Sequence, residues 1–224
     1  MRSSCHHVFP ILRLLVLLGL TFTLCACVST SQNLSGKQAS IATSLAEGNS
    51  VVFGKIHWIE NGKEKKIGKG LFDFYIKPSL LRLEDKTRTL AEVGENGQFV
   101  WALAPGTYVI NRLEYRDNWS GNYFFVPQVG FRVHDPQKTY YIGQLDAEFT
   151  SERDLIGGLS GNARFKVVDH SAVAYPIYAD KAGTDSSSLE KSLMVHEKNL
   201  PRTFDTTAEF NLGMQLLNAI LSGM

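Results

Sequence analysis

Short runs of alternating apolar and polar residues cover the middle of the chain and predict β-strands. Residues typical of turns separate these runs. Asn61-Gly62 and Asn96-Gly97 are hairpin signals, because Asn and Gly tolerate a positive φ. The expected strands cover residues 51–59, 67–76, 82–93, 98–103, 107–116, 122–133, 139–149 and 162–169. Short strands at this spacing predict a mainly β fold, a single antiparallel β-sandwich that occupies residues 39–180.

Helical patterns lie on both sides of the strands. A short helix is expected at residues 39–47. Further along, Ser187 and Thr206 each open a capping-box pattern, with Glu three residues later. We therefore expect residues 181–224 to be a helical segment that packs on the sandwich. Its last helix, 207–221, is apolar around most of its circumference, which favours burial, with contact to a partner or a membrane as the alternative.

The N-terminus has the pattern of an export signal. It contains Arg2 and Arg13 and no acidic residue, and an apolar run follows at residues 14–24. A basic start, an apolar segment of this length and a small residue are typical of a secretory signal peptide. The apolar run is shorter than the roughly 20 residues that a transmembrane helix needs. Residues 1–26 are therefore expected to be removed.

The end of this signal, Leu24-Cys25-Ala26-Cys27, resembles the lipobox of bacterial lipoproteins. The lipobox has an apolar residue three positions before a cysteine and a small residue directly before it. Cys27 fits both positions, whereas Cys25 would follow the bulky Leu24. The resemblance implies cleavage after Ala26, a diacylglycerol on the Cys27 thiol and acylation of the new amine. The alternative is an ordinary signal peptide with two incidental cysteines.

The cysteine count agrees with this interpretation. Besides Cys25 and Cys27 the chain contains only Cys5, so cleavage would leave Cys27 alone and the body without a disulfide. Two or more acyl chains at one residue anchor a protein stably to a membrane. Residues 27–38 are then the lipidated cysteine and a flexible tether. Val28 and Ser29 follow the cysteine in place of aspartate, which by analogy with enteric bacteria favours the outer membrane, facing the periplasm or the cell surface.

The charge balance argues against nucleic acid as a partner. The chain contains 23 basic and 22 acidic residues, with a formal net charge of +1. Nucleic-acid binding needs clustered Lys and Arg. The most basic stretch, residues 63–69, is expected at a solvated hairpin tip, with docking to anionic headgroups as the alternative.

Two stretches carry a family resemblance. WALAPGTYVINRLEY, residues 101–115, has a Pro-Gly turn before a Tyr-bearing strand, and HDPQKTYYIGQLDAEF, residues 134–149, has a turn before a Tyr-Tyr-Ile-Gly strand. Together they resemble transthyretin-like or carboxypeptidase-regulatory-like sandwiches, in particular uncharacterised bacterial lipoproteins with such a domain. The resemblance covers roughly residues 50–170 and implies a structural or interaction module without catalytic residues.

Motifs for catalysis or metal binding do not stand out. The histidines of the mature chain lack the spacing of a local metal site. The glycine-rich segment 157–161 does not match a nucleophile elbow, which needs a glycine two positions after its serine, where this chain has Asn162. Asp146 and Glu148 share one strand face and are the acid–base candidates for glycan hydrolysis. We predict no cofactor and no metal. The histidines are His57, His134, His170 and His196.

Aromatic residues gather at residues 112–125, beside amides and an arginine. Exposed aromatic rings in such surroundings can hold a sugar or a partner protein. Tyr115, Trp119 and Tyr123 are therefore the candidate binding surface, although about half of the aromatic residues in this stretch are expected to enter the core.

The sequence thus predicts a membrane-anchored bacterial lipoprotein that acts as a structural or interaction module of the cell envelope and is not an enzyme. Its expected partners are the membrane, through the lipid, and an envelope protein or polymer. The alternatives are a lipoprotein that binds a carbohydrate or small ligand and, third, an envelope glycan hydrolase.

Overall fold

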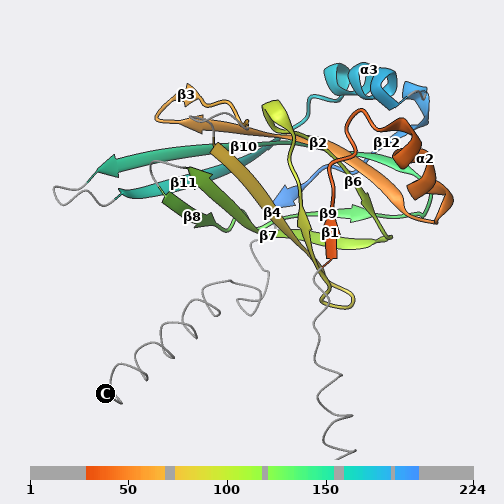
Figure 1. The fold of residues 1–224 in the computed structure, drawn as a ribbon, viewed down its shortest axis with the longest axis horizontal. Coiled ribbons are helices and arrows are strands. Elements are labelled where there is room, and N and C mark those ends of the chain that lie inside the picture. The colour runs from red at the N-terminus through yellow and green to blue at the C-terminus, as the bar shows by residue number, and fades with distance from the viewer. Residues whose placement is uncertain (1–28, 69–73, 118–120, 154–158, 183–184, 197–224) are drawn as a thin grey trace, which may run out of the picture.

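The computed structural model describes residues 29–68, 74–117, 121–153, 159–182 and 185–196, and these are mostly β-strands (Figure 1). The strands form two sheets, and two helices accompany them within the described residues. The predicted mainly β fold is confirmed. The predicted helix at 39–47 is also confirmed as α2 (Gln38–Ala46).

The first sheet runs in the order β1-β5-β4-β7-β9-β13, and β8 pairs with the far end of β7. The long strands β4 and β7 pair antiparallel along their length. The strands of this sheet are β1 (Ser29–Ser31), β4 (Phe74–Arg82), β5 (Arg88–Ala91), β7 (Gly106–Asp117), β8 (Gly121–Phe125), β9 (Val129–Val133) and β13 (Val195–His196).

The second sheet runs in the order β11-β10-β2-β3, with β6 also on β2 and β12 on β10. Its strands are β2 (Ser50–Glu60), β3 (Lys63–Glu64), β6 (Gln98–Leu103), β10 (Thr139–Arg153), β11 (Leu159–Val168) and β12 (Leu189–Lys191). The two central strands, β2 and β10, run parallel, as do the pairs β1–β5 and β10–β12. The sheets are therefore mixed, and the expectation of a purely antiparallel sandwich is wrong in this respect. Turn signals in the sequence predict local hairpins, but they do not show which distant strands pair.

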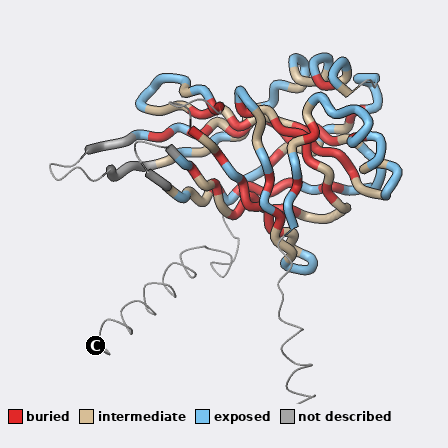
Figure 2. Tube along the Cα trace, in the orientation of Figure 1, coloured by how far each residue is buried: buried red, intermediate tan, exposed pale blue. Residues whose placement is uncertain are grey.

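One core lies between the two sheets, and buried residues concentrate there (Figure 2). Trp58 and Trp101 of the second sheet meet side chains such as Phe74 and Ile110 of the first, all at 1% exposure or less. Burial of each large apolar side chain contributes roughly 1.5–3 kcal/mol, so packing alone can hold a body that lacks disulfides. This arrangement is compatible with a β-sandwich.

Several predicted strand boundaries are wrong, and the strand expected at 122–133 is two strands, β8 and β9. The strand expected to stop before Pro78 instead continues through it as β4, where Pro78 lies opposite Leu113 of β7. On its other side β4 pairs with β5 only at Ser79–Leu81, so Pro78 interrupts no pairing there. The strand expected at 82–93 is a turn followed by the short β5, and Lys86 in that turn has a φ of 63°.

Residues 29–34 of the segment expected to be a flexible tether are ordered. Ser29–Ser31 form β1 on the edge of the first sheet. Leu34 is buried in a second, smaller apolar cluster, which includes Val100 of β6 and Tyr178 of α3. Hydrogen bonds to both sheets, described below, hold this segment.

The region after residue 170 also differs from the expectation. Helix α3 (Ser171–Ala182) begins within the predicted sandwich, where Pro176 interrupts the helical pattern in the sequence. The helix expected from Ser187 is instead a 3-10 turn, η3 (Ser186–Ser188), followed by β12 and β13, because Asp185 caps the turn by accepting the Ser187 amide. The helix expected at 207–221 lies outside the described residues.

Candidate binding site

A cleft of about 340 Å³ lies between helix α3 and the outer face of the second sheet. Clefts of this size that mix apolar walls with a few polar groups are typical of small-molecule sites. The lining residues come from β2, β6, β10 and α3, which the fold brings together from distant parts of the chain. They include Phe53, Lys55, Gln98, Tyr141, Gln144, Val173, Ile177, Tyr178 and Lys181.

Strand register divides the floor of the cleft into an apolar row and a polar row. Phe53 of β2 lies opposite Val100 of β6 and Tyr141 of β10. Two positions further along β2, Lys55 lies opposite Gln98 and Gln144 on the same strands. The floor therefore changes from apolar to cationic within one step of two residues along the sheet.

A β-bulge in β10 creates this arrangement. Ile142 and Gly143 together lie opposite the single residue Gly54, so the register shifts between Tyr141 and Gln144. Without the extra residue, side chains three positions apart would point to opposite faces of the sheet. Gly143 adopts a φ of +98°, which favours glycine. The Tyr-Tyr-Ile-Gly motif of the sequence thus places Tyr141 and Gln144 on the same face.

Aromatic rings connect the floor to α3. The Tyr178 ring stacks on the Phe53 ring, and Tyr141 contacts both Phe53 and Tyr175, with ring centroids 5.3 and 5.6 Å apart. Burial raises the pKa of the Tyr178 hydroxyl to about 12. The Tyr141 hydroxyl accepts the backbone N–H of His170 at 2.9 Å, which fixes the start of α3. This wall of the cleft is uncharged at neutral pH.

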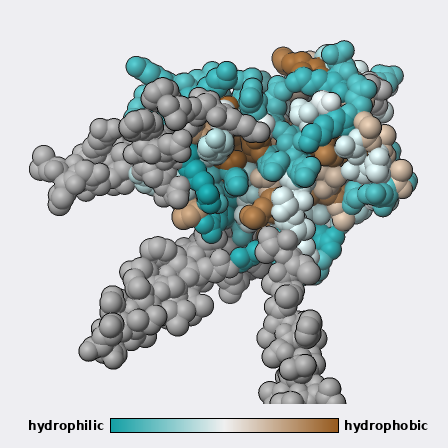
Figure 3. Space-filling view, in the orientation of Figure 1, coloured by the Kyte–Doolittle hydropathy of each residue, from teal (hydrophilic) through white to brown (hydrophobic). Residues whose placement is uncertain are grey.

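Helix α3 also presents apolar side chains to solvent. Val173 is 63% exposed and Ile177 is 42% exposed, and both line the cleft. A hydrophobic patch is visible over α3 at the top of the space-filling view (Figure 3). Exposed apolar side chains that gather beside a cleft mark a binding surface more often than scattered ones do.

The polar end of the cleft carries two lysines. The Lys181 ammonium donates to the Gln98 side-chain oxygen at 2.8 Å, and Lys55 lies between Gln98 and Gln144 in the sheet. Gln144 donates to Asp146 at 2.7 Å, on the side of the cleft away from α3. Lysine and amide groups can together bind an anionic or hydrogen-bonding headgroup.

A histidine–carboxylate cluster lies next along the sheet. His57 Nδ1 is 3.1 Å from Asp146, and His57 Nε2 is 3.4 Å from Glu64. Glu148, the other acid–base candidate, lies further along β10 opposite Arg164. Among the described residues, no group of three or more His, Cys, Asp or Glu side chains could hold a metal ion. The simplest interpretation of the cluster is a group of hydrogen-bonded polar side chains on a partly exposed sheet face.

The aromatic surface predicted from the sequence is mostly core. Tyr115 is 1% exposed and contacts Trp58 and Phe74, so it cannot form an open binding face. Tyr123 is half-buried against the same core cluster. Its neighbour Phe124 is exposed, beneath the guanidinium of Arg112 at 3.6 Å from the ring centroid. Trp119 and Cys27 lie outside the described residues.

The sequence did contain one signal for the cleft. On the outer face of β2, Val51 and Phe53 are apolar, whereas Lys55 and His57 are polar. An outer face that begins apolar indicates that another element covers it there. Comparison of the chain with protein families, with curated proteins and with solved structures finds no match to any of the three.

Proposed function

We propose that this protein is a lipid-anchored envelope protein whose cleft beneath α3 binds a small amphipathic ligand. The observation that carries the proposal is the change within the cleft from the apolar row at Phe53 to the polar row at Lys55. It favours the small-ligand alternative over a purely structural module. The binding surface differs from the aromatic stretch that the sequence suggested.

The anchor part of the proposal rests on the N-terminal sequence. The basic start, the apolar run and Leu24-Cys25-Ala26-Cys27 support export and acylation of Cys27. Within the part of the chain that the structure describes, no helix has the length and apolarity to cross a membrane. Attachment through Cys27, at the outer membrane by analogy, would hold the body at an envelope surface.

The chemistry of the cleft limits the ligand class. Its apolar floor and the exposed Val173 and Ile177 suit a hydrocarbon portion. Lys55 and Lys181 suit an anionic group at one end. The volume of about 340 Å³ fits a single small molecule near the lower limit of ligand pockets. We therefore propose that the ligand is an anionic amphiphile such as a medium-chain fatty acid.

The test is a binding titration of the purified mature protein with dodecanoate, with dodecanol as the uncharged comparison. We expect dodecanoate to bind, Lys55→Gln to reduce its affinity about tenfold, and dodecanol to bind more weakly to the parent protein. Lys77→Gln changes an exposed lysine of β4, far from the cleft, and should have no effect.

Blocking the apolar wall gives a second arm. Val173→Asn should abolish dodecanoate binding, and the fold should be kept because Val173 is largely exposed. Val195→Asn changes another exposed valine and should leave dodecanoate binding unchanged. Equal binding by both variants, or no binding by the parent protein, would overturn the proposal.

A further inference from the structure

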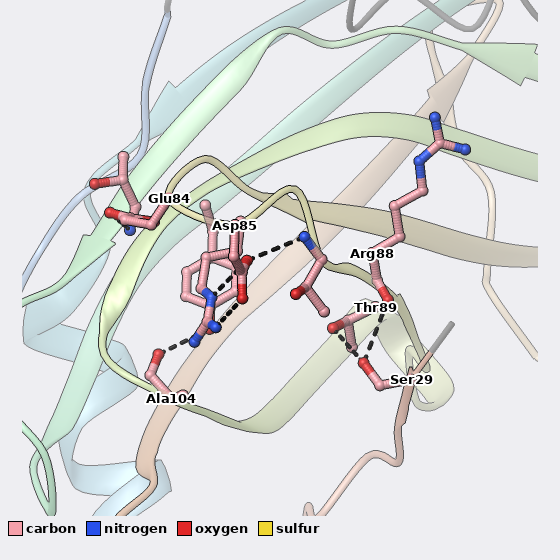
Figure 4. A network of polar contacts seen from close by, with 10 residues as sticks. Ser29, Glu84, Asp85, Arg88, Thr89 and Ala104 are labelled. Carbon is pink, nitrogen blue, oxygen red and sulfur yellow. Dashed lines mark hydrogen bonds and ion pairs between the residues drawn. The ribbon is translucent and has the colours of Figure 1, made fainter. Parts of the chain in front are cut away.

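The described chain starts as a strand fixed to the body. β1 pairs in parallel with β5, with Ser29 opposite Thr89. The Ser29 hydroxyl lies 2.7 Å from the Thr89 hydroxyl oxygen and donates to the Arg88 carbonyl at 3.3 Å (Figure 4). Ser31 accepts the Glu92 amide at 3.1 Å and is buried.

The same segment then binds the second sheet. The Leu34 amide donates to the Val100 carbonyl at 2.9 Å. The Asn33 side chain accepts the Val100 amide at 3.0 Å and donates to the Gln98 carbonyl at 3.2 Å. Residues 29–34 thus connect an edge of each sheet, and the chain is held firmly from the second residue after the lipobox cysteine.

This attachment limits the reach of an anchor on Cys27. Ser29 lies two positions after Cys27, and a fully extended chain covers at most about 7 Å over that distance. A flexible linker of ten residues would instead have a mean reach of roughly 15–20 Å. An acyl chain on Cys27 would therefore hold the body close to the lipid headgroups and restrict its orientation.

The strand direction shows which end of the body would meet the membrane. Because β1 and β5 are parallel, the chain before Ser29 leaves at the same end as the turn that precedes β5, residues 83–87. In Figure 1 the start of β1 and this turn lie at the bottom of the view, and α3 lies at the top.

The turn at residues 83–87 is compact, and its acidic groups are engaged in holding it. Asp85 accepts the Arg82 Nε–H and the Thr87 amide, both at 3.0 Å. Glu84 accepts the Thr107 amide at 2.8 Å. Lys86 is exposed at the tip. The exposed tip of the turn is therefore polar, which suits contact with hydrated phospholipid headgroups.

We propose that the turn at residues 83–87 rests on the phospholipid headgroups, so that the body stands on the bilayer at this end and presents the α3 cleft away from it. This inference depends on the acylation of Cys27 in the proposed function. It replaces the expected flexible tether by a short, oriented attachment.

The test uses the lipidated mature protein in vesicles of phosphatidylcholine and phosphatidylglycerol. Lys86→Cys and Asp180→Cys each carry a fluorophore, and iodide quenching is measured in detergent and in vesicles. Cys27 does not react because its thiol is acylated. We expect the quenching constant at position 86 to fall several-fold in vesicles, and that at position 180, on α3, to stay unchanged.

A variant with ten Gly and Ser residues inserted after Val28 tests the short anchor. Quenching at position 86 should return in this variant, because the longer linker frees the body from the surface. Equal quenching at positions 86 and 180 in the parent protein would overturn the orientation alone. Continued protection of position 86 after the insertion would overturn the short anchor as the cause of that orientation. A mass that shows Cys27 unmodified would overturn the anchor as well, which distinguishes the two failures.

Discussion

The Tyr178 ring of α3 lies parallel to the Phe53 ring of β2, with centroids 4.1 Å apart and planes inclined by 10°. This contact joins the helix to the sheet and forms the closed side of the cleft. Tyr178 is the buried residue of α3, whereas Val173 and Ile177 of the same helix remain exposed. Among the described residues, this stack is the shortest of the ring contacts that dock α3 on the sheet.

Truncation of this ring should release the helix. Tyr178→Ala removes the stack and leaves a cavity, and we expect a loss of about 3 kcal/mol in the free energy of unfolding, measured by denaturant titration. Tyr178→Phe keeps the ring and should change stability by less than about 1 kcal/mol, because the hydroxyl makes no hydrogen bond of normal geometry to the described residues. A large loss of unfolding free energy in Tyr178→Phe would contradict this account of the helix contact.

The close approach of β2 and β10 at the bulge should not tolerate a side chain. A Cβ at Gly54 would lie 2.5 Å from the Gly143 carbonyl oxygen and 2.7 Å from the Phe99 ring. We expect Gly54→Ala to cost at least about 3 kcal/mol or to prevent folding, since backbone and core cannot move apart cheaply. Gly48→Ala is the control. Its Cβ would meet no atom within 4 Å, so the strain of a φ of +86° should cost only about 1 kcal/mol.

Acid should weaken the link between the start of α3 and β12. The Lys191 ammonium, 2.7 Å from Asp169, and the Ser171 amide lower the pKa of the Asp169 carboxyl to about 2. Because this pKa lies below the unfolded value, the contribution to stability is present above about pH 4 and lost as the pH falls to 2. The pair is solvent-exposed, so we expect less than about 1 kcal/mol.

Chemical unfolding at pH 7 and pH 2 can isolate this contribution. Asp169→Asn should be less stable than the parent protein at pH 7 and should approach it at pH 2. If the difference in unfolding free energy between Asp169→Asn and the parent protein is the same at both pH values, the carboxylate charge is unimportant for stability.

Loss of the Asn33 side chain should detach the N-terminal segment. Asn33→Leu removes the hydrogen bonds to Val100, Gln98 and Ser35, and we expect a loss of about 2 kcal/mol in unfolding free energy. Faster hydrogen exchange at the amides of Leu34 and Val100 should accompany it. Gln32→Leu, at the exposed neighbouring position, is the control and should leave exchange at these amides unaltered.

The local turn chemistry was predictable from the sequence. Asn61 and Gly62 adopt φ values of 51° and 76° in the turn between β2 and β3, as the hairpin signal requires. Asn96 and Gly97 also adopt positive φ values, 61° and 78°, but the hairpin expected there is wrong, because they connect β5 of the first sheet to β6 of the second. Strands β6 and β7 also begin and end close to the predicted residues. Such features depend on neighbours in the sequence, which a single sequence displays directly.

The environment of Tyr115 was not predictable from simple alternation. Tyr108 and Ile110 face the core on even positions, but Leu113 and Tyr115 face it on odd ones. The shift follows from the irregular pairing of β7 with β4 at Asn111, which inserts one residue. No turn residue marks this position, so alternation alone cannot reveal which aromatic side chains are buried.

The cleft was hidden for a different reason. It requires Phe53 and Tyr141 to be neighbours across a parallel pairing, and Tyr178 to lie above them. A single sequence does not encode such distant pairings in its periodicity. Pro176 also disguised the helix, since proline normally interrupts helical patterns.

The parallel pairing of β2 with β10 has a consequence for biogenesis. Residues 51–60 are synthesised early, yet their central partner, residues 139–149, follows only after most of the first sheet has been made. Until then β2 has β6 on one side and an unpaired edge on the other, and such edges invite association with other chains. Aggregation during synthesis is therefore most to be expected along β2, until β10 covers its free edge.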